Sequence, residues 1–270
     1  MNYATLELFL EGGIAQVRLN RPDKANAMNR AMWADIRAAF DWIDATPEAR
    51  VAVITGNGAH FTAGIDLTML AGLQAGIGDE CEGRSGEKLR RIILDLQDVL
   101  TSLERCRKPV LAAVHGACLG AGVDLICCAD MRYATADCVL QVKEIDLGIT
   151  ADVGTLQRLP KLVGDGLARE LAYTGRQVSG TEAREIGLVN RVFDSFDTLV
   201  AGVKEIAGTI AAKSPLAVRG VKEMLLYARD HTVADGLNYV ATWNAAMLMS
   251  ADLREAMTAA AQKRVAEFRD

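Results

Sequence analysis

The chain lacks the patterns of several common kinds of site. Its six cysteines include no C-x-x-C pair and its three histidines have no metal-ligand spacing, which argues against a zinc site and a disulfide framework. No Ser or Cys nucleophile stands in a recognised turn, so triad chemistry is disfavoured. Its glycine-rich loops fit neither the dinucleotide G-x-G-x-x-G pattern nor the P-loop. We therefore expect no metal and no nucleotide cofactor.

Charge and hydrophobicity disfavour two kinds of partner. The formal net charge is -5 and basic residues form no long cluster, so neither nucleic acid nor an anionic membrane is expected to bind. No window approaches the roughly eighteen apolar residues of a membrane span. The start lacks a basic and apolar leader pattern, and the end is not Ser-Lys-Leu. We expect a soluble cytoplasmic protein with free thiols.

Short apolar strands alternate with helical patterns up to about residue 194. This order predicts an α/β protein with a largely parallel sheet and crossover helices. We expect residues 70–86, which are rich in glycine and polar side chains, to be mobile. The expected strands are Leu6–Leu10, Ile14–Leu19, Val51–Thr55, Val110–Val114, Met131–Ala134 and Val139–Val142. The expected helices are Asn29–Ala45, a helix that opens at the glycines of Gly116 to Gly122 and runs through Leu125 to about Ala129, and Thr155–Val163.

Beyond about residue 194 the pattern changes to consecutive helices with no strand between them. The last helices carry large apolar side chains on broad faces, among them Leu237 and Trp243, which favours contact with a partner as well as core packing. We therefore divide the chain into a core of residues 1–195 and a helical region of residues 196–270. The expected helices are Thr198–Ala211, Pro215–Tyr227, Val233–Met249 and Asp252–Phe268.

Two glycine-dense loops, Gly56 to Leu67 and Gly116 to Gly122, each follow a predicted strand. Small residues let a ligand approach the backbone closely and leave amide N–H groups free to donate. Two such donors can form an oxyanion hole for a carbonyl that gains negative charge. Each loop alone is at least as readily a structural turn, so the hypothesis rests on their joint occurrence. The candidate donors are the amides of Gly64, Ile65, Ala121 and Gly122.

Three carboxylates, Asp124, Glu144 and Asp152, stand among small and apolar residues close to these loops in sequence. Burial raises the pKa of such an acid toward neutrality, which suits proton transfer. Structural explanations remain open for each. Asp124 could sit in the first turn of a helix and Asp152 could cap the helix at Thr155. Glu144 could pair with Lys143 or an arginine.

Phe61 to Asp66 and Gly116 to Gly122 resemble the two oxyanion-hole motifs of the crotonase, or enoyl-CoA hydratase/isomerase, superfamily. The resemblance covers nearly the whole chain and includes Asn20-Arg-Pro and Ala183 to Asn190. Within the superfamily, Gln141 to Pro160 is similar to the Δ3,5-Δ2,4-dienoyl-CoA isomerases.

The resemblance implies a ClpP/crotonase-type spiral of ββα units, with residues 196–270 making the contacts of a trimer or a dimer of trimers. The family binds an acyl-CoA thioester, with its carbonyl oxygen between the N–H groups that correspond here to Ile65 and Ala121. The family has glycine where Ala121 stands, and a backbone donor survives that change. Coenzyme A is then part of the substrate and no cofactor is required. The implied substrate-binding residues are Ala63, Gly64, Ile65, Asp66, Leu67 and Ala121.

The carboxylates depart from the hydratase pattern, which has glutamate in place of Asp124 and glycine in place of Asp152. Moving two double bonds requires removal of a proton at C2 and delivery of one at C6. By similarity, Glu144 abstracts at C2, Asp152 protonates C6 and Asp124 supports them. The expected activity is conversion of 3,5-dienoyl-CoA to 2,4-dienoyl-CoA in fatty acid β-oxidation.

Other functions stay open. A 2-enoyl-CoA hydratase or a Δ3,Δ2-enoyl-CoA isomerase would share the fold, although Asp124 and Asp152 argue against the first and the third carboxylate against the second. A non-catalytic RNA- or protein-binding homologue is the alternative of another class, and the acidic net charge speaks against it.

Overall fold

The computed structural model describes residues 3–270, and their side chains except those of residues 73–75. Its main sheet has the strand order β1-β2-β3-β4-β6-β9, in which β1 is antiparallel to β2 and the other neighbours are parallel. The strands are β1 Leu6–Glu11, β2 Ile14–Leu19, β3 Val51–Gly56, β4 Val110–Val114, β6 Met131–Thr135 and β9 Arg191–Phe193. A second sheet has the order β5-β7-β8 and contains β5 Ala117–Leu119, β7 Val139–Gln141 and β8 Val178–Ser179.

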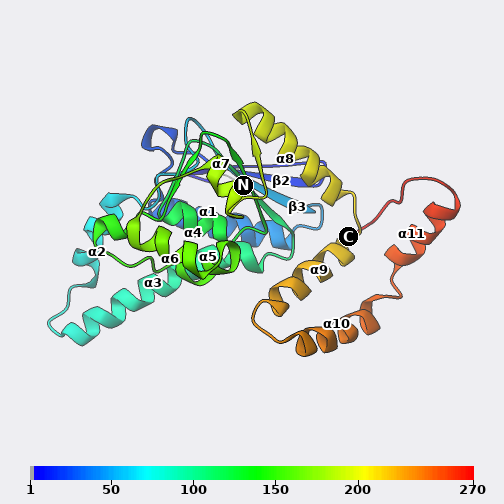
Figure 1. The fold of residues 1–270 in the computed structure, drawn as a ribbon. Helices are drawn as coiled ribbons and strands as arrows, with labels where there is room; N and C mark the ends of the chain where they lie inside the picture. Colours follow the sequence, from blue (N-terminus) through cyan, green and yellow to red (C-terminus); the bar gives the residue numbers. More distant parts are fainter. Residues whose placement is uncertain (1–2) are drawn as a thin grey trace.

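Helices cover both faces of the main sheet, which explains why β4 is buried at every position. Leu111 and Ala113 of β4 pack with α8, whereas Ala112 and Val114 belong to the larger core on the opposite face. Figure 1 shows α8 on one side of the sheet and α1 and α4 on the other. The helices of this part are α1 Arg30–Ala45, α2 Leu67–Ile77, α3 Glu82–Arg105, α4 Ala121–Cys127, α5 Thr155–Val163, α6 Asp165–Thr174, α7 Gly180–Glu185 and α8 Phe196–Ala211, with 3-10 turns η1 Pro22–Lys24 and η2 Glu144–Leu147.

The mobility predicted for residues 70–86 stays a prediction, and the segment is largely helical. Most of this segment belongs to α2 and to the start of α3. Asp66 caps α2 by accepting the Thr68 backbone N–H at 3.0 Å. α3 is stabilised farther along, where its apolar residues recur at helical spacing and pack against α1 and α2. Packing of the rest of α3 therefore offsets the low helix propensity of the glycines in its first turns.

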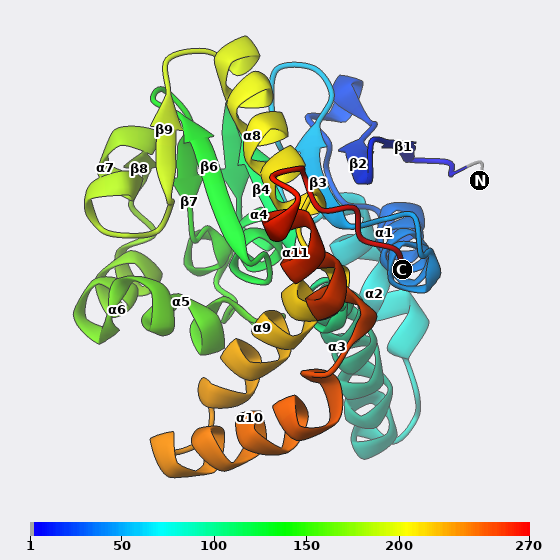
Figure 2. The same ribbon diagram turned by 90° about the vertical axis from the view of Figure 1, so that its right-hand side faces the viewer.

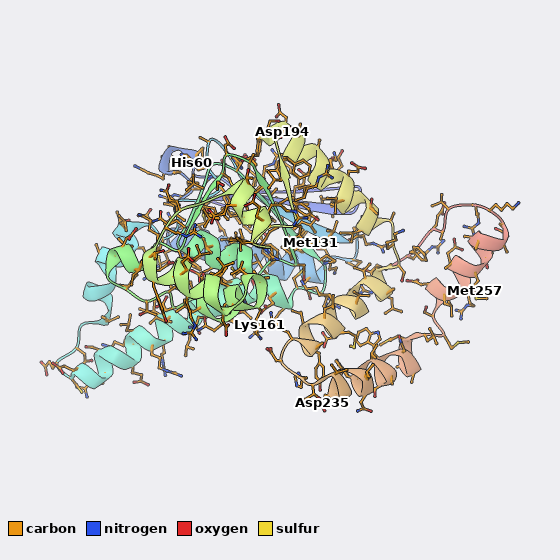
Figure 3. The ribbon with its side chains drawn as sticks, in the orientation of Figure 1. His60, Met131, Lys161, Asp194, Asp235 and Met257 are labelled. Carbon is orange, nitrogen blue, oxygen red and sulfur yellow. The ribbon has the colours of Figure 1, made fainter. Side chains whose placement is uncertain are left out.

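Three helices at the C-terminus extend away from the sheets (Figures 1 and 2). The last one ends at Ala261, short of the predicted Phe268, because the chain turns back at Lys263 and Arg264 pairs with Glu255. The side chains of Asp235 and Met257 lie far from the sheet (Figure 3). No helix within residues 3–270 is long and apolar enough to cross a membrane. The three helices are α9 Pro215–Ala228, α10 Val233–Met247 and α11 Ala251–Ala261.

The division of the chain at residue 195 stays a prediction. α8, which begins at Phe196, packs Leu199, Val203 and Ala207 on the main sheet, and α9 to α11 follow it.

Candidate active site

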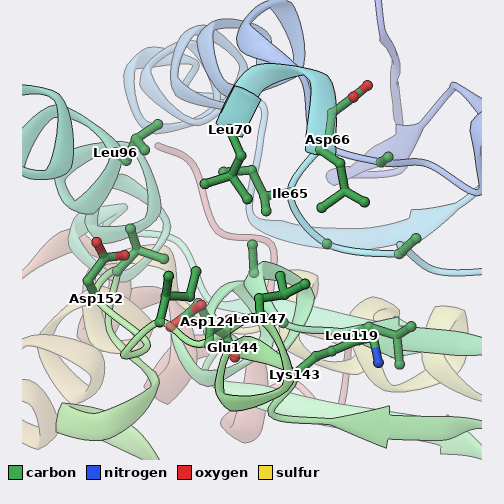
Figure 4. Close-up of a pocket in the computed structure, with 18 of the residues that line it drawn as sticks. Ile65, Asp66, Leu70, Leu96, Leu119, Asp124, Lys143, Glu144, Leu147 and Asp152 are labelled. Carbon is green, nitrogen blue, oxygen red and sulfur yellow. The ribbon is translucent and has the colours of Figure 1, made fainter. Parts of the chain in front are cut away.

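A cavity of about 620 Å³ lies beside the two glycine-rich loops. Asp124, Glu144 and Asp152 all line it, as Figure 4 shows. They come from the start of α4, the start of η2 and the segment before α5. The loop residues named from the sequence line it as well, namely Ala63, Gly64, Ile65, Asp66, Leu67 and Ala121. The fold thus brings together residues that are far apart in the chain.

The two loops lie side by side. The Leu119 backbone N–H donates to the Thr62 carbonyl at 3.1 Å, which links one loop to the other like a short parallel bridge. Gly64 has φ +89°, and a Cβ at this position would lie 2.5 Å from the Leu119 oxygen and 3.4 Å from the Ala121 nitrogen. Glycine is therefore required at residue 64, because any side chain would push the loops apart.

Three of the four candidate amides remain available as donors, and of these Ile65 and Ala121, but not Gly122, line the cavity. Throughout residues 3–270, no protein acceptor receives a hydrogen bond from the backbone N–H of Ile65 or Ala121. The Gly64 N–H instead donates to the Thr62 hydroxyl at 3.1 Å, so the expectation that it is a free donor is wrong. Ile65 and Ala121 thus present two amides to the cavity from neighbouring loops.

Asp124 is completely buried in the first turn of α4. Its Oδ1 accepts the Thr155 backbone N–H at 2.5 Å, while its Oδ2 is buried and has no hydrogen-bond partner among the described residues. Burial raises the pKa of Asp124 to about 6, although the hydrogen bond from Thr155 opposes the shift. A helix-turn position alone does not explain an unpartnered carboxylate oxygen that faces a cavity.

Glu144 lies against the second loop, since a Cβ on Gly120 would be 3.1 Å from its Oε1. Its Oε2 is buried without a partner. Burial and the nearby Asp124 carboxylate raise the pKa of Glu144 to about 7. The alternative pairing with Lys143 does not occur, because Lys143 contacts Asp146 at 3.2 Å instead.

Asp152 lies on the part of the cavity wall next to Leu96 of α3 (Figure 4). Its side chain does not cap α5, since the N-cap position belongs to Gly154 and the Thr155 N–H at that end donates to Asp124 instead. Partial burial raises the pKa of Asp152. Its backbone carbonyl accepts a 2.6 Å hydrogen bond from Gln97 Nε2. Asp152 is therefore not a helix cap, and its side chain lines the cavity.

Asp66 and Leu67 line the cavity farther from the three carboxylates. Asp66 binds Arg21 at 2.9 Å and Thr68, and in Figure 4 its carboxylate points away from the other three. Leu67 is 61 % exposed at the rim. These residues shape the first loop and its mouth, whereas the proton-carrying groups lie deeper.

Residues 70–88 are the predicted source of the pocket wall, but the apolar residues of α3 that line it lie just beyond this range, and the supports behind the carboxylates were not predicted. Leu70 of α2 and four residues of α3 make this wall, and the supports are Gln97 and Arg158. The helical spacing of the α3 residues was the signal that could have found the wall. The four α3 residues are Leu89, Ile92, Ile93 and Leu96.

Comparisons with known proteins identify the group that this chain resembles. The sequence profile described as enoyl-CoA hydratase/isomerase matches residues 10–270. The peroxisomal Delta(3,5)-Delta(2,4)-dienoyl-CoA isomerase of Arabidopsis thaliana is 46% identical, over 99% of this chain and 98% of its own. The mitochondrial Delta(3,5)-Delta(2,4)-dienoyl-CoA isomerase of Homo sapiens is also 46% identical, over 93% of this chain and 77% of its own.

The fold has close counterparts among solved structures. The crystal structure of enoyl-CoA hydratase from Bacillus anthracis superposes with a TM-score of 0.89 at 30% identity, over 98% of this chain and 99% of its own. The predicted crotonase-like α/β fold is thus confirmed.

One prediction is contradicted by these relatives. A cytoplasmic location was expected because the sequence shows no recognised targeting pattern, but the similar isomerases are named as peroxisomal or mitochondrial. The absence of a familiar address was too weak a signal to assign a compartment. The matched profile, the relatives and the shared fold all describe one group of proteins: the chain belongs to the enoyl-CoA hydratase/isomerase family.

Proposed function

We propose that this protein is a Δ3,5-Δ2,4-dienoyl-CoA isomerase. The observation that carries the proposal is the arrangement of three carboxylates in one cavity, with Asp152 away from the Asp124 and Glu144 pair and two free amides beside them. Relatives at 43–46% identity that are named for this reaction support it.

The reaction begins with the thioester carbonyl oxygen accepting hydrogen bonds from the amides of Ile65 and Ala121. Ionised Glu144 takes a proton from C2, and the electrons spread over the dienolate that these two amides stabilise. The double bonds then shift toward the thioester as Asp152 donates its proton at C6. Glu144 ends protonated and Asp152 ionised, and exchange with water restores both.

The pKa values suit these roles. A pKa of about 7 leaves a useful fraction of Glu144 ionised near neutral pH and makes it a stronger base than an ordinary glutamate. The raised pKa of Asp152 favours the protonated acid that the second step needs. Asp124 contributes by raising the pKa of Glu144 through its nearby charge.

The substrate is an acyl-CoA thioester whose chain lies along the apolar wall of α2 and α3. We place the reaction in fatty acid β-oxidation, where unsaturated chains require double bonds to be moved. The exposed apolar faces of α10 and α11, with Leu237 and Met257 more than 60 % exposed, support assembly into a trimer or a dimer of trimers. No step needs a redox group or a metal, so we propose that no cofactor takes part.

Hydration of 2-enoyl-CoA is the second candidate. It is favoured by the unpartnered, buried oxygens of Asp124 and Glu144, which could hold one water between them. Asp152 has no task in that reaction.

The test is to convert a 3,5-dienoyl-CoA in D₂O and locate the deuterium in the product by NMR. The proposed route predicts 2,4-dienoyl-CoA labelled at C6. A product hydrated at C3, or no product from this substrate, would count against it.

A further inference from the structure

One face of α3 carries three polar residues, Gln97, Thr101 and Glu104, at the i, i+4 and i+7 spacing of a helix stripe. Each contacts the segment that begins α5. Gln97 Nε2 donates to the Asp152 carbonyl at 2.6 Å. Thr101 and Glu104 accept hydrogen bonds from Arg158. The stripe therefore faces the stretch of chain that presents Asp152 to the cavity.

Arg158 is the centre of this contact. Its guanidinium binds both oxygens of Glu104, at 3.2 Å from Nε and 2.9 Å from Nη2, and reaches the Thr101 hydroxyl at 3.3 Å. Arg229, at the end of α9, binds Glu104 as well. Burial raises the pKa of Glu104, but the hydrogen bonds and charges of Arg158 and Arg229 outweigh it and hold the pKa at about 2. The ion pair thus stays charged at every working pH.

The same guanidinium lies against the backbone two residues beyond Asp152. Gly154 has φ +137°, and a Cβ there would lie 2.0 Å from Arg158 Nη1. Ala151 and Val153 on either side of Asp152 are buried. The segment is therefore fixed on three sides: by Gln97 at its carbonyl, by Arg158 beneath Gly154, and by the core.

We propose that Arg158, anchored by Glu104, is a positioning residue that holds Asp152 at the distance from Glu144 that C6 protonation requires. Arg158 touches no reacting atom in this role. Glu144 is carried by η2 and does not depend on the support. The proposal rests on the proposed function, because it assigns Arg158 to the Asp152 step alone.

Arg158→Lys tests the proposal, because lysine keeps the charge but cannot bind both Glu104 oxygens and Thr101 together. We expect conversion of 3,5-dienoyl-CoA to fall about 10²-fold, since a displacement near 1 Å costs about that much, while C2 proton exchange in D₂O changes by less than about threefold. Amide hydrogen exchange of residues 151–154, followed by mass spectrometry, should become faster than in the unmodified protein. Gln97→Met removes only the bond to the Asp152 carbonyl. It should also lower conversion of 3,5-dienoyl-CoA and make amide exchange of residues 151–154 faster.

Arg176→Lys is the matched control, because Arg176 also binds carboxylates, those of Glu170 and Glu182, but within the described residues makes no hydrogen bond to α3 or to residues 151–154. It should leave conversion, C2 exchange and the 151–154 amides unchanged. Two results for Arg158→Lys would overturn the proposal. Conversion and C2 exchange could fall by the same factor, or neither could fall. Should the unmodified protein fail to convert the dienoyl substrate, the proposed function fails, and unchanged exchange of the 151–154 amides would separately overturn the support assigned to Arg158.

Discussion

Asp124 and Thr155 are joined by a 2.5 Å hydrogen bond from the Thr155 backbone N–H to Asp124 Oδ1. The bond connects the first turn of α4 to the first residue of α5. It occupies one carboxylate oxygen and leaves Oδ2 buried, unpartnered and on the cavity wall. Asp124 therefore holds the two helix starts together and places a second negative charge near Glu144.

Asp124→Asn should lower the pKa of Glu144, because the Asp124 charge is one of the causes that raise it. The acidic limb of the kcat/KM profile should move to lower pH, since this profile reports groups of the free enzyme. Measurement of kcat/KM from pH 5 to pH 9 checks the shift. An unmoved limb would show that the Asp124 charge does not contribute to the pKa of Glu144.

Asp152→Asn should reduce conversion of 3,5-dienoyl-CoA by about 10²-fold or more, because the amide cannot deliver the C6 proton. C2 exchange through Glu144 should remain in part. Absorbance of the conjugated product follows the first reaction, and NMR in D₂O follows the second. Normal conversion by this variant would remove Asp152 from the mechanism.

Glu144→Gln should abolish both conversion and C2 exchange, because the base common to the two events is lost. Asp146→Asn is the control, since Asp146 lies two residues away in η2 and is exposed. The control should keep both activities. If Glu144→Gln still exchanged the C2 proton, another group would have to be the base.

Stability should depend on pH through Glu144. Its folded-state pKa is raised from 4.5 to about 7, so the folded protein retains a proton that the unfolded chain releases. The contribution of this bound proton to the free energy of unfolding is fully present below pH 4.5 and is lost as the pH rises through about 7. Glu144→Gln should therefore gain stability relative to the unmodified protein at pH 8 but not at pH 4.5. Urea unfolding at the two pH values measures the difference, and an equal effect at both would contradict the raised pKa.

Gly154→Ala should destabilise the protein by at least about 2 kcal/mol, because alanine is strained at φ +137° and its Cβ would strike Arg158. Gly208→Ala is the matched control, since nothing lies within 4 Å of a Cβ at this position of α8. It should stabilise the helix by about 0.5–1 kcal/mol. Denaturation midpoints compare the two variants, and equal midpoints would show that Gly154 is not constrained.

The local sequence pattern predicted the bounds of a helix or strand correctly where the segment is continuously apolar or has clear boundary residues. β4 has the predicted bounds Val110–Val114, and α5 has the predicted bounds Thr155–Val163. Contacts between distant residues decided the failures. The start of α3 is rich in glycine and charge, and the end of α11 is set by Arg264 reaching Glu255.

In the candidate site, too, some features could be predicted from local sequence, whereas others depend on contacts between distant residues. The carboxylates and the two loops could be found from the sequence because unusual residues stand beside glycine-rich turns. The Gly64 amide is occupied because the Thr62 hydroxyl accepts its N–H, whereas no acceptor within residues 3–270 receives the Ile65 N–H. The support of Asp152 by Gln97 depends on a contact between residues 55 positions apart. Spacing along the chain does not contain such information.

The most direct test of the central claim is an ultraviolet assay of the purified protein with a 3,5-dienoyl-CoA, beside a 2-enoyl-CoA hydration assay under the same conditions. The proposed function predicts rapid formation of the conjugated 2,4-dienoyl thioester and slow hydration. Rapid hydration with no conjugation would contradict it and assign Asp124 and Glu144 to a hydratase.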